Sequence, residues 1–318
     1  MMVTPEMEIE MKPKILAVVG PTASGKSALA VSLAARLNGE IVSCDSMQIY
    51  RGMDIGTAKP DEAEQGGIPH HMLDIVSPEE SFSCADYGRM ARDEADDILR
   101  RGALPVFCGG TGLYLDAVLR SGFAPDVPPR IREELRKREP GELYRELCEV
   151  DPVSADAIHP NNVKRVVRAL EIYHGTGKTK SEWDRLSALA EQPYDALLIG
   201  LDYRSRETLY ERIDRRVDDM LQRGLCEEVK RLDLLRDSTA AQAIGYKELY
   251  GWLDGQCGME EAVSTLKQNT RNYAKRQLTW FRRNPDIHWL YPDDYPAGER
   301  NDAVLAESMR LCLDFLRN

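Results

Sequence analysis

A glycine-rich loop directly after a short apolar segment offers the clearest chemistry in the sequence. It matches the pattern G-x4-G-K-[ST] and consists of Gly20, Pro21, Thr22, Ala23, Ser24, Gly25, Lys26 and Ser27. Glycines let backbone N–H groups turn towards phosphate oxygens, and the start of the following helix adds positive partial charge. Lys26 supplies a full charge, and the Ser27 hydroxyl is placed to bind Mg²⁺. The pattern predicts a diphosphate or triphosphate site and leaves open which molecule carries the phosphates.

Two further polar positions follow predicted strands. Asp45 follows the apolar residues 40–44, and Thr111 follows residues 104–108 and two glycines, Gly109 and Gly110. Open α/β folds bind ligands at the carboxyl edge of the sheet, so we expect Asp45 to face the phosphate site and to orient or deprotonate an acceptor. Asp45 as a cap of a helix or turn is the alternative. The Gly-Gly-Thr turn is equally well explained by close approach of the backbone to a ligand and by a tight turn that caps the next helix.

The elements around these positions predict an α/β fold with a parallel sheet. Apolar residues 14–20, 40–44, 71–76 and 104–108 are predicted strands, and residues 24–37 and 83–101 are predicted helices. Strands that alternate with helices indicate a parallel sheet covered on both faces. Between residues 123 and 192 there is no strand pattern, whereas residues 196–203 and 287–291 again indicate strands. We therefore predict a loose lead-in (1–13), a P-loop NTPase-like core (14–122 and 196–318) and an all-helical insertion domain (123–195).

Charge distribution indicates an anionic partner more clearly than net charge does. The formal net charge is −11, which taken alone argues against nucleic acid. However, residues 267–283 carry six Lys or Arg and no acid, and smaller basic groups occur at residues 130–138 and 164–168. Each single group is also explained by a solvated helix face. The acid-free stretch is harder to explain in so acidic a chain.

Other features exclude some classes of protein. The seven Cys form no C-x-x-C pair, which favours reduced thiols in a cytoplasmic protein. No apolar run approaches the ~20 residues of a membrane span, and the N-terminus lacks the apolar core of a signal peptide. His70 and His71 are adjacent, but no third ligand has suitable spacing, so we favour a structural role. Trp280 is the one tryptophan that lies within a basic segment.

Seven sequence blocks together resemble one known family. They are GPTASGKS, DSMQIYRGMDIGTAKP, PHHMLDIVSPEE, GGTGLY, HPNNVKRVVRALE, QAIGYKE and KRQLTWFRR, in this order between residues 14 and 291. The order is similar to that of the tRNA dimethylallyltransferases, the tRNA isopentenyltransferases of the MiaA type. The C-terminal zinc finger common in eukaryotic relatives is absent, so the chain resembles the bacterial form.

The resemblance implies a reaction, partners and a cofactor. A transferase of this family moves the dimethylallyl group of dimethylallyl diphosphate to the exocyclic N6 of the adenosine on the 3′ side of the anticodon, and it releases diphosphate. The loop at residues 20–27 would then hold that diphosphate and not ATP for hydrolysis. The partners would be dimethylallyl diphosphate and a tRNA anticodon stem-loop, the cofactor Mg²⁺, and the protein a cytoplasmic monomer without membrane attachment.

The resemblance also implies roles for individual residues. Asp45 matches the general base, Thr22 lies near the leaving oxygen, Thr111 contacts the substrate nucleotide, and Arg216 (or Arg215, if the register slips) binds the diphosphate. The implied tRNA-contacting residues are Asp45, Ser46, Met47, Gln48, Thr111, Arg132, Lys164, Arg165, Val166, Val167, Arg168, Gln242, Ala243, Ile244, Gly245, Tyr246, Lys247, Lys275, Arg276, Gln277, Leu278, Thr279, Trp280, Phe281 and Arg282.

Three other functions fit parts of the pattern. A P-loop kinase of a small metabolite would share the loop and Asp45, but it has no need of the basic residues 267–283. An adenylate isopentenyltransferase would use a free nucleotide as acceptor, and the basic residues 164–168 in the insertion argue against it. A nucleotide-dependent regulatory or RNA-binding module without chemistry would leave Asp45 dispensable.

Overall fold

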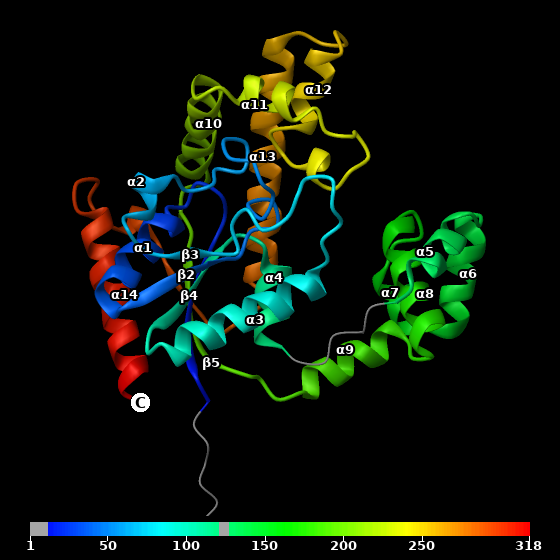
Figure 1. Cartoon of the computed structure of the whole chain (residues 1–318), viewed down its shortest axis with the longest axis horizontal. Helices are drawn as coiled ribbons and strands as arrows, with labels where there is room; N and C mark the ends of the chain where they lie inside the picture. Colours follow the sequence, from blue (N-terminus) through cyan, green and yellow to red (C-terminus); the bar gives the residue numbers. More distant parts are fainter. Residues whose placement is uncertain (1–11, 121–126) are drawn as a thin grey trace, which may run out of the picture. The chain divides into compact units, whose positions relative to one another are not determined.

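The computed structural model describes residues 12–120 and 127–318, and a parallel sheet lies at its centre (Figure 1). The strands are β1 (Lys14–Val19), β2 (Gly39–Ser43), β3 (His70–His71), β4 (Leu104–Gly109), β5 (Asp195–Leu201) and β6 (Ile287–Leu290). Their order across the sheet is β3-β2-β4-β1-β5-β6, and every pairing is parallel. The predicted α/β fold with a parallel sheet is thereby confirmed.

Helices cover both faces of the sheet, which explains why most residues of β1, β4 and β5 are apolar and buried. On one face, Leu16 and Val18 of β1 belong to a core that includes Leu33 of α1 (Lys26–Leu37) and Cys312 of α14 (Arg300–Arg317). On the other face lies α3 (Cys84–Arg100), in which Tyr87 is buried and its hydroxyl donates to the Ser43 carbonyl at 2.8 Å. The two layers hold the sheet rigid from both sides.

Three loops that carry candidate residues meet at one edge of the sheet. The loops follow β1, β2 and β4, and these strands are neighbours in the order β2-β4-β1. The turn after β4 lies directly against the turn after β2: the amide of Thr111 donates to the Cys44 carbonyl at 3.1 Å. A Cβ at Gly109 would lie 2.0 Å from that same carbonyl oxygen, so only glycine fits there.

A group of helices packs beyond the sheet in the same compact unit. It contains α10 (Arg206–Gln222), α11 (Leu225–Leu232), the 3₁₀ turn η1 (Ala240–Gln242), α12 (Lys247–Leu253) and the long α13 (Met259–Phe281). Ile213 of α10 and Ala274 and Leu278 of α13 are buried in one cluster with Ala23 of the glycine-rich loop. The short elements α2 (Glu62–Gln65), α4 (Gly112–Leu119) and η2 (Pro292–Asp294) complete the order.

The chain divides into two compact units. The first runs up to Asp116 and continues from Tyr194 to Asn318, and the second is Ala117–Pro193. The second unit contains only helices among its described residues: α5 (Pro129–Arg136), α6 (Pro140–Val150), α7 (Pro152–Ala157), α8 (Val163–Thr176) and α9 (Lys180–Leu189). Leu143, Leu147 and Leu170 form its own buried core.

One predicted strand is much shorter than expected. Residues 71–76 were predicted to be a strand, but β3 contains only His70 and His71. The backbone turns into the left-handed region at Met72 (φ 62°) and Asp74 (φ 54°), which an extended strand does not allow. Val76 only forms an isolated parallel bridge with Tyr50. The lead-in up to residue 11 and the predicted boundary at residues 123–126 lie outside the described residues.

In the described ranges, no helix has both the length and the apolarity that crossing a membrane requires.

Candidate active site

The glycine-rich loop, residues 20–27, wraps tightly between β1 and α1. Gly20 and Gly25 have φ of +145° and +97°, and Ala23 is also left-handed at 62°. A Cβ at Gly20 would lie 2.4 Å from the Leu201 carbonyl oxygen, so a side chain there would push the loop off the sheet. Gly25 is the N-cap of α1 and leaves the first amides of the helix directed outward. The geometry agrees with an anion-binding loop.

Two cations converge on this loop without a carboxylate partner. The Lys26 ammonium donates only to the Pro21 carbonyl, at 3.2 Å, and an Arg216 Nη1 lies 3.4 Å from the Thr22 hydroxyl. Burial lowers the pKa of both cations, whereas the nearby negative charge of Asp45 raises the pKa of both. No carboxylate of the described chain is within ion-pair distance of either cation. Both side chains are half-buried, and cations that lack a carboxylate partner in such a place are stabilised by an anionic ligand.

Gln277 of α13 joins the glycine-rich loop to the turn after β4. Its Oε1 accepts from the amide of Thr22 at 2.9 Å, and its Nε2 donates to the Gly110 carbonyl at 3.0 Å. A Cβ at Gly110 would lie 2.0 Å from that Nε2, so the contact requires glycine. Arg212 of α10 adds a hydrogen bond of 2.8 Å from Nε to the Ala23 carbonyl. Two helices from the second half of the chain therefore hold the loop in shape.

Asp45 lies at the neighbouring turn with one oxygen held and one open. Its Oδ1 accepts from the Met47 amide at 2.9 Å, and the described residues offer no hydrogen bond to its Oδ2. The Thr111 hydroxyl accepts from the Ser46 amide at 3.1 Å and lies 3.4 Å from the Ser46 hydroxyl. Thr111 therefore supports the turn that carries Asp45. A carboxylate with one fixed and one open oxygen is suited to accept a proton.

One pocket of about 270 Å³ collects these groups. Its polar side includes Thr22, Lys26, Ser27, Asp45 and Arg216. Its apolar side is formed by Ile213, Val217, Met220, Ile244 and Leu266. Residues 46–48, 242–245, Lys247, Arg276 and Gln277 complete the implied site residues that line it. Arg215 is exposed and absent from this lining, whereas Arg216, one residue on, faces the pocket.

Sequence reasoning missed many residues that line this pocket, among them the apolar Ile213, Val217 and Leu266 and the titratable Tyr273 and Cys108. Burial raises the pKa of the Tyr273 phenol, and the Asp45 charge raises it further, so the hydroxyl stays protonated. Burial raises the pKa of the Cys108 thiol to about 11, although Lys26 and a hydrogen bond with Ser27 lower it. Tyr273 is one polar residue of a long amphipathic helix and Cys108 ends an apolar strand, so neither has a local signal.

In the structure, some of the basic residues in 267–283 form ion pairs with described carboxylates and others do not. Lys267 and Arg271 form ion pairs with Asp218 and Asp214 of α10, and Arg282 pairs with the buried Asp202 at 2.7 Å. Lys275 and Arg276 form no ion pair with a described carboxylate and are exposed. Gln277, Leu278 and Phe281 are buried, so the hypothesis of tRNA contact on α13 narrows to its exposed side chains. Trp280 packs at Gly112, and Arg283 lies over its ring.

For residues 242–247, too, the hypothesis of tRNA contact is restricted to the exposed side chains. Ala243 and Tyr246 are buried, and the Tyr246 side chain points into the protein, where its hydroxyl is hydrogen-bonded to Glu228. Lys247 is the residue of this segment with a charged side chain at the pocket. Contact through the buried members is therefore limited to backbone atoms, because their side chains are already packed.

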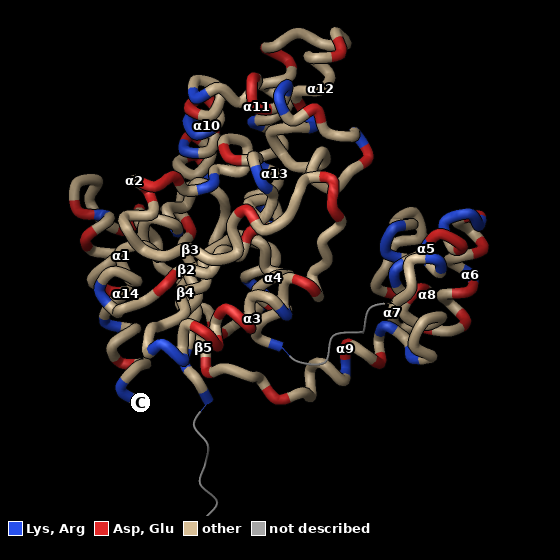
Figure 2. The backbone as a smooth tube through the Cα atoms, viewed as in Figure 1, with Lys and Arg blue, Asp and Glu red and all other residues tan. Residues whose placement is uncertain are grey.

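A second basic site lies within the helical unit. Figure 2 shows Lys and Arg along α5, and a pocket of about 270 Å³ there is lined by Arg132, Arg136, Val163, Lys164, Val167, Arg168 and Glu171. Arg132 binds the buried Glu171 through two nitrogens at 3.0 Å, and Arg168 contacts it at 3.2 Å. Val166 and Val167 belong to the core, so Lys164, Arg165 and Arg168 carry the exposed charge of this segment.

The two adjacent histidines have structural partners. The His70 Nδ1 is hydrogen-bonded to the Ile68 carbonyl, and burial lowers its pKa. His71 lies between Glu40 (2.7 Å) and Glu94 (3.0 Å). Within the described ranges, no group of three or more His, Cys, Asp or Glu side chains is placed to hold a metal ion. Any Mg²⁺ here would depend on Ser27 and on ligands supplied by a substrate.

Sequence comparison shows the same family along most of the chain. Residues 48–284 match the family model described as IPP transferase, and residues 13–78 match the model described as isopentenyl transferase. The chain is 51% identical to the tRNA dimethylallyltransferase of Anoxybacillus flavithermus over 298 residues, which cover 91% of this chain and 94% of that protein. For that of Caldanaerobacter subterraneus the identity is 47%, with coverage of 91% and 95%.

Solved structures agree with this result. A full-length tRNA isopentenylpyrophosphate transferase from Bacillus halodurans is 44% identical with a TM-score of 0.72, and the match covers 96% of this chain and 99% of that one. A eukaryotic dimethylallyltransferase acting on tRNA is 33% identical with a TM-score of 0.79, over 88% and 74% of the two chains. With the fold, the glycine-rich loop and the Asp45 turn in one arrangement, these matches show that the chain belongs to the IPP transferase family, among the tRNA dimethylallyltransferases.

Proposed function

We propose that this protein transfers the dimethylallyl group of dimethylallyl diphosphate to the exocyclic N6 of the adenosine on the 3′ side of the anticodon in tRNAs, and releases diphosphate. The printed activity of the relatives supports this proposal. The observation that carries it is the pocket itself. It combines a carboxylate that has an open oxygen, Asp45, with two half-buried cations that lack a described carboxylate partner and with apolar lining residues.

The glycine-rich loop would hold the diphosphate. Outward amides at the start of α1, Lys26 and Arg216 supply positive charge where the leaving group gains negative charge. Among the described residues, the buried Ser24 hydroxyl oxygen of this loop has no hydrogen-bond partner, so one polar atom of the loop is left unsatisfied. Gln277 keeps the Thr22 amide in place while this charge develops.

The pocket contains a side chain that can serve as a ligand of Mg²⁺. Mg²⁺ binds through one or two protein oxygens together with substrate phosphates and water, and it needs no protein cage. The Ser27 hydroxyl at the start of α1 lines the pocket beside Lys26 and provides such an oxygen. When bound, the ion would neutralise charge on the diphosphate.

The acceptor amine would lose its proton to Asp45. The adenine N6 is a poor nucleophile because its lone pair is delocalised into the ring. As the N6–C1 bond to the allyl carbon forms and the C1–O bond to diphosphate breaks, the open Oδ2 of Asp45 accepts the N6 proton. Ile213, Val217 and Leu266 provide apolar surface for the five-carbon group. The base has to leave its stack to reach this pocket.

Exposed cations would hold the anticodon stem-loop, mainly through phosphates. They are Lys275 and Arg276 on α13, and Lys164, Arg165 and the Glu171-held pair Arg132 and Arg168 in the helical unit. As the family resemblance implies, we expect the protein to act as a monomer. Because the proposed substrate is tRNA, we also expect the protein to act in the cytoplasm.

The experiment is incorporation of radiolabelled dimethylallyl diphosphate into unmodified bacterial tRNA, with AMP as a parallel acceptor and Mg²⁺ present. Label on tRNA and not on AMP supports the proposal. Label on AMP favours the adenylate branch, and ATP hydrolysis without label favours a kinase. Omission of Mg²⁺ with a chelator tests the cofactor in the same assay.

Arg216→Gln should lower kcat/KM for dimethylallyl diphosphate by about 10- to 100-fold, because a charge-assisted hydrogen bond contributes about 1.5–3 kcal/mol. Arg215→Gln is the matched control, since this neighbour on α10 is exposed and outside the pocket. Steady-state kinetics with varied diphosphate measures both. Equal losses in the two variants would contradict the assignment of Arg216.

The double variant Lys164→Gln and Arg165→Gln should weaken tRNA binding and flatten its salt dependence. Each lost phosphate contact reduces the slope of log K against log [salt] by about 0.7–0.9. Filter binding between low and moderate salt gives the slope. The control is Lys178→Gln with Lys180→Gln, which removes the same charge beyond the C-terminal end of α8. An unchanged slope in the first variant would remove this segment from the interface.

A further inference from the structure

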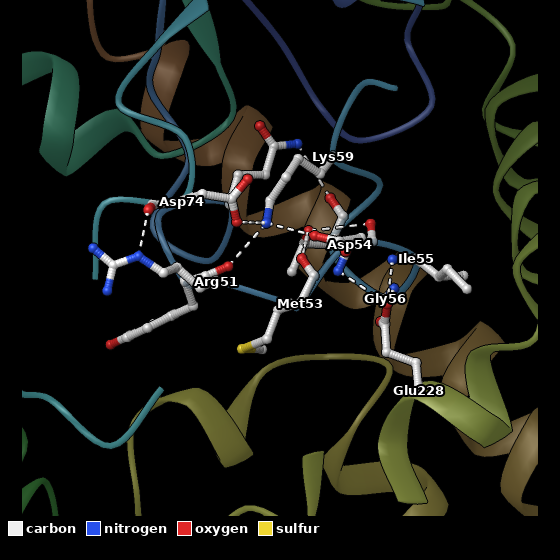
Figure 3. A network of polar contacts seen from close by, with 12 residues as sticks. Arg51, Met53, Asp54, Ile55, Gly56, Lys59, Asp74 and Glu228 are labelled. Carbon is white, nitrogen blue, oxygen red and sulfur yellow. Dashed lines mark hydrogen bonds and ion pairs between the residues drawn. The ribbon is translucent and has the colours of Figure 1, made fainter. Parts of the chain in front are cut away.

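Glu228 of α11 is a buried carboxylate that lies against the loop at residues 54–56 (Figure 3). It is 4% exposed. Its Oε2 accepts from the amides of Asp54 (3.0 Å) and Ile55 (2.8 Å). Its Oε1 accepts from the amide of Gly56 (2.9 Å) and from the Tyr246 hydroxyl (2.6 Å). The carboxylate is fully satisfied by three consecutive backbone amides and one phenol.

The amides belong to a loop that faces the reacting groups. Gly56, Thr57 and Ala58 of the loop at residues 54–58 line the pocket. The Gln48 Nε2 donates to the carbonyls of Thr57 (3.2 Å) and Ala58 (3.1 Å). Gln48 lies three residues after Asp45 on the same turn. A displacement of the loop would therefore be transmitted directly to the turn that carries Asp45.

The Tyr246 phenol belongs to a second segment beside the pocket, residues 242–246. Tyr246 follows residues 242–245, which line the pocket as well. A Cβ at Gly56 would lie 2.4 Å from the Tyr246 ring. Gly245 has φ +102°, and a Cβ there would lie 3.4 Å from the Gly56 carbonyl oxygen, so the two backbones are close neighbours. Glu228 is the charged group at this junction, with hydrogen bonds to both segments.

A buried cation holds the loop from its other side. Lys59 Nζ donates to the Tyr50 carbonyl (2.9 Å), to Asp54 Oδ1 (2.7 Å) and to Asp74 (Figure 3). Asp54 is thus bound through its amide by Glu228 and through its side chain by Lys59. Two buried charges of opposite sign, each with partners, fix the loop between them, and removal of one leaves unpaired polar groups.

The glycine-rich loop is held by other residues. Its described side-chain contacts with α10 and α13 run to Gln277, Arg212 and Arg216, and none of the partners of Glu228 belongs to residues 20–27. Loosening the Glu228 junction should therefore disturb the acceptor side of the pocket and leave the diphosphate side intact.

We infer that Glu228 is a positioning residue that sets the acceptor side of the pocket, by holding the loop at residues 54–58 against Tyr246 and so fixing the Gln48–Asp45 turn. The inference rests on the proposed function for the identity of the acceptor. In Glu228→Gln, the amide nitrogen accepts no hydrogen bond. Depending on which oxygen it replaces, it faces either the Asp54 and Ile55 amides or the Gly56 amide and the Tyr246 hydroxyl, so the loop is held less firmly while the size of the side chain is kept.

The experiment compares Glu228→Gln with Glu227→Gln in full-length protein. Glu227 is the adjacent, exposed residue of the same helix, so the substitution is chemically identical. For Glu228→Gln we expect KM for tRNA to rise at least fivefold and KM for dimethylallyl diphosphate to change less than twofold. We also expect faster amide hydrogen exchange in residues 53–58, with exchange in residues 20–27 unchanged. Tyr246→Phe removes one of the four hydrogen bonds and should show the same pattern more weakly.

Other outcomes overturn the inference. If Glu228→Gln behaves like Glu227→Gln in both readouts, the junction does not position the acceptor. If both KM values and exchange throughout the chain rise together, Glu228 has only a general structural role. Should Glu228→Gln fail to fold, Tyr246→Phe decides by the same two readouts. Absence of label transfer by the unmodified protein would contradict the proposed function, whereas the exchange measurement would still decide whether Glu228 holds the loop.

Discussion

Asp45→Asn should reduce kcat for prenyl transfer by about 10²–10⁴-fold, the range expected when a general base is removed. The amide keeps an oxygen that can accept from the Met47 amide, so the turn should persist, but the open position can no longer take a proton. Single-turnover transfer of label to tRNA measures the chemical step. Binding of tRNA should stay within about twofold, because the phosphate contacts are elsewhere.

The control for this prediction is Asp93→Asn, an exposed carboxylate of α3 outside the pocket. It should retain the activity of the unmodified protein. A normal kcat in Asp45→Asn would leave Asp45 as a turn-capping residue. A loss of tRNA binding equal to the loss of kcat would instead make it a binding residue.

Lys26→Met should lower kcat by about 10²–10³-fold, the typical effect of removing one group that stabilises developing charge in a buried site. The substitution keeps an unbranched side chain of similar length. It removes the cation that, within the described chain, has no carboxylate partner. Because that cation is half-buried without an ion pair, its loss should not lower the melting temperature of the free protein, which a melting curve measures.

Lys137→Met is the control, since Lys137 is exposed at the C-terminal cap of α5. A shift in melting temperature caused by dimethylallyl diphosphate should also disappear in Lys26→Met and persist in Lys137→Met. Undiminished kcat together with an undiminished ligand-induced shift would contradict the diphosphate role of Lys26.

The parts of the site that were predicted correctly in position depend on local signals. The apolar residues 14–20 and the glycine pattern after them are short-range features, and β1, the loop and α1 occur there. Asp45 and Thr111 follow predicted strands, and the parallel sheet brings their turns into contact, as the carboxyl-edge rule predicts. Their catalytic roles stay predictions.

What the sequence did not reveal are the partners brought in by distant segments. Gln277 and Glu228 are single polar residues of amphipathic helices, and their neighbours in the chain do not indicate a buried partner 255 or 173 positions away. The acid-free residues 267–283 suggested a continuous basic surface. Asp214 and Asp218 on α10 neutralise part of it, and that pairing depends on how two helices pack.

The strand order has a consequence for how the protein is made. β1 pairs with β4 and with β5, and the Thr22 amide donates to Gln277, all of which lie later in the sequence than β1. During synthesis at about 5–20 residues per second, the first strand therefore emerges many seconds before either of its neighbours. Until residue 201 has left the ribosome, this mostly apolar strand cannot be paired on both edges within its own sheet. The nascent chain should thus depend on chaperones, and chains that stop before α13 should be degraded and not persist as partly active fragments.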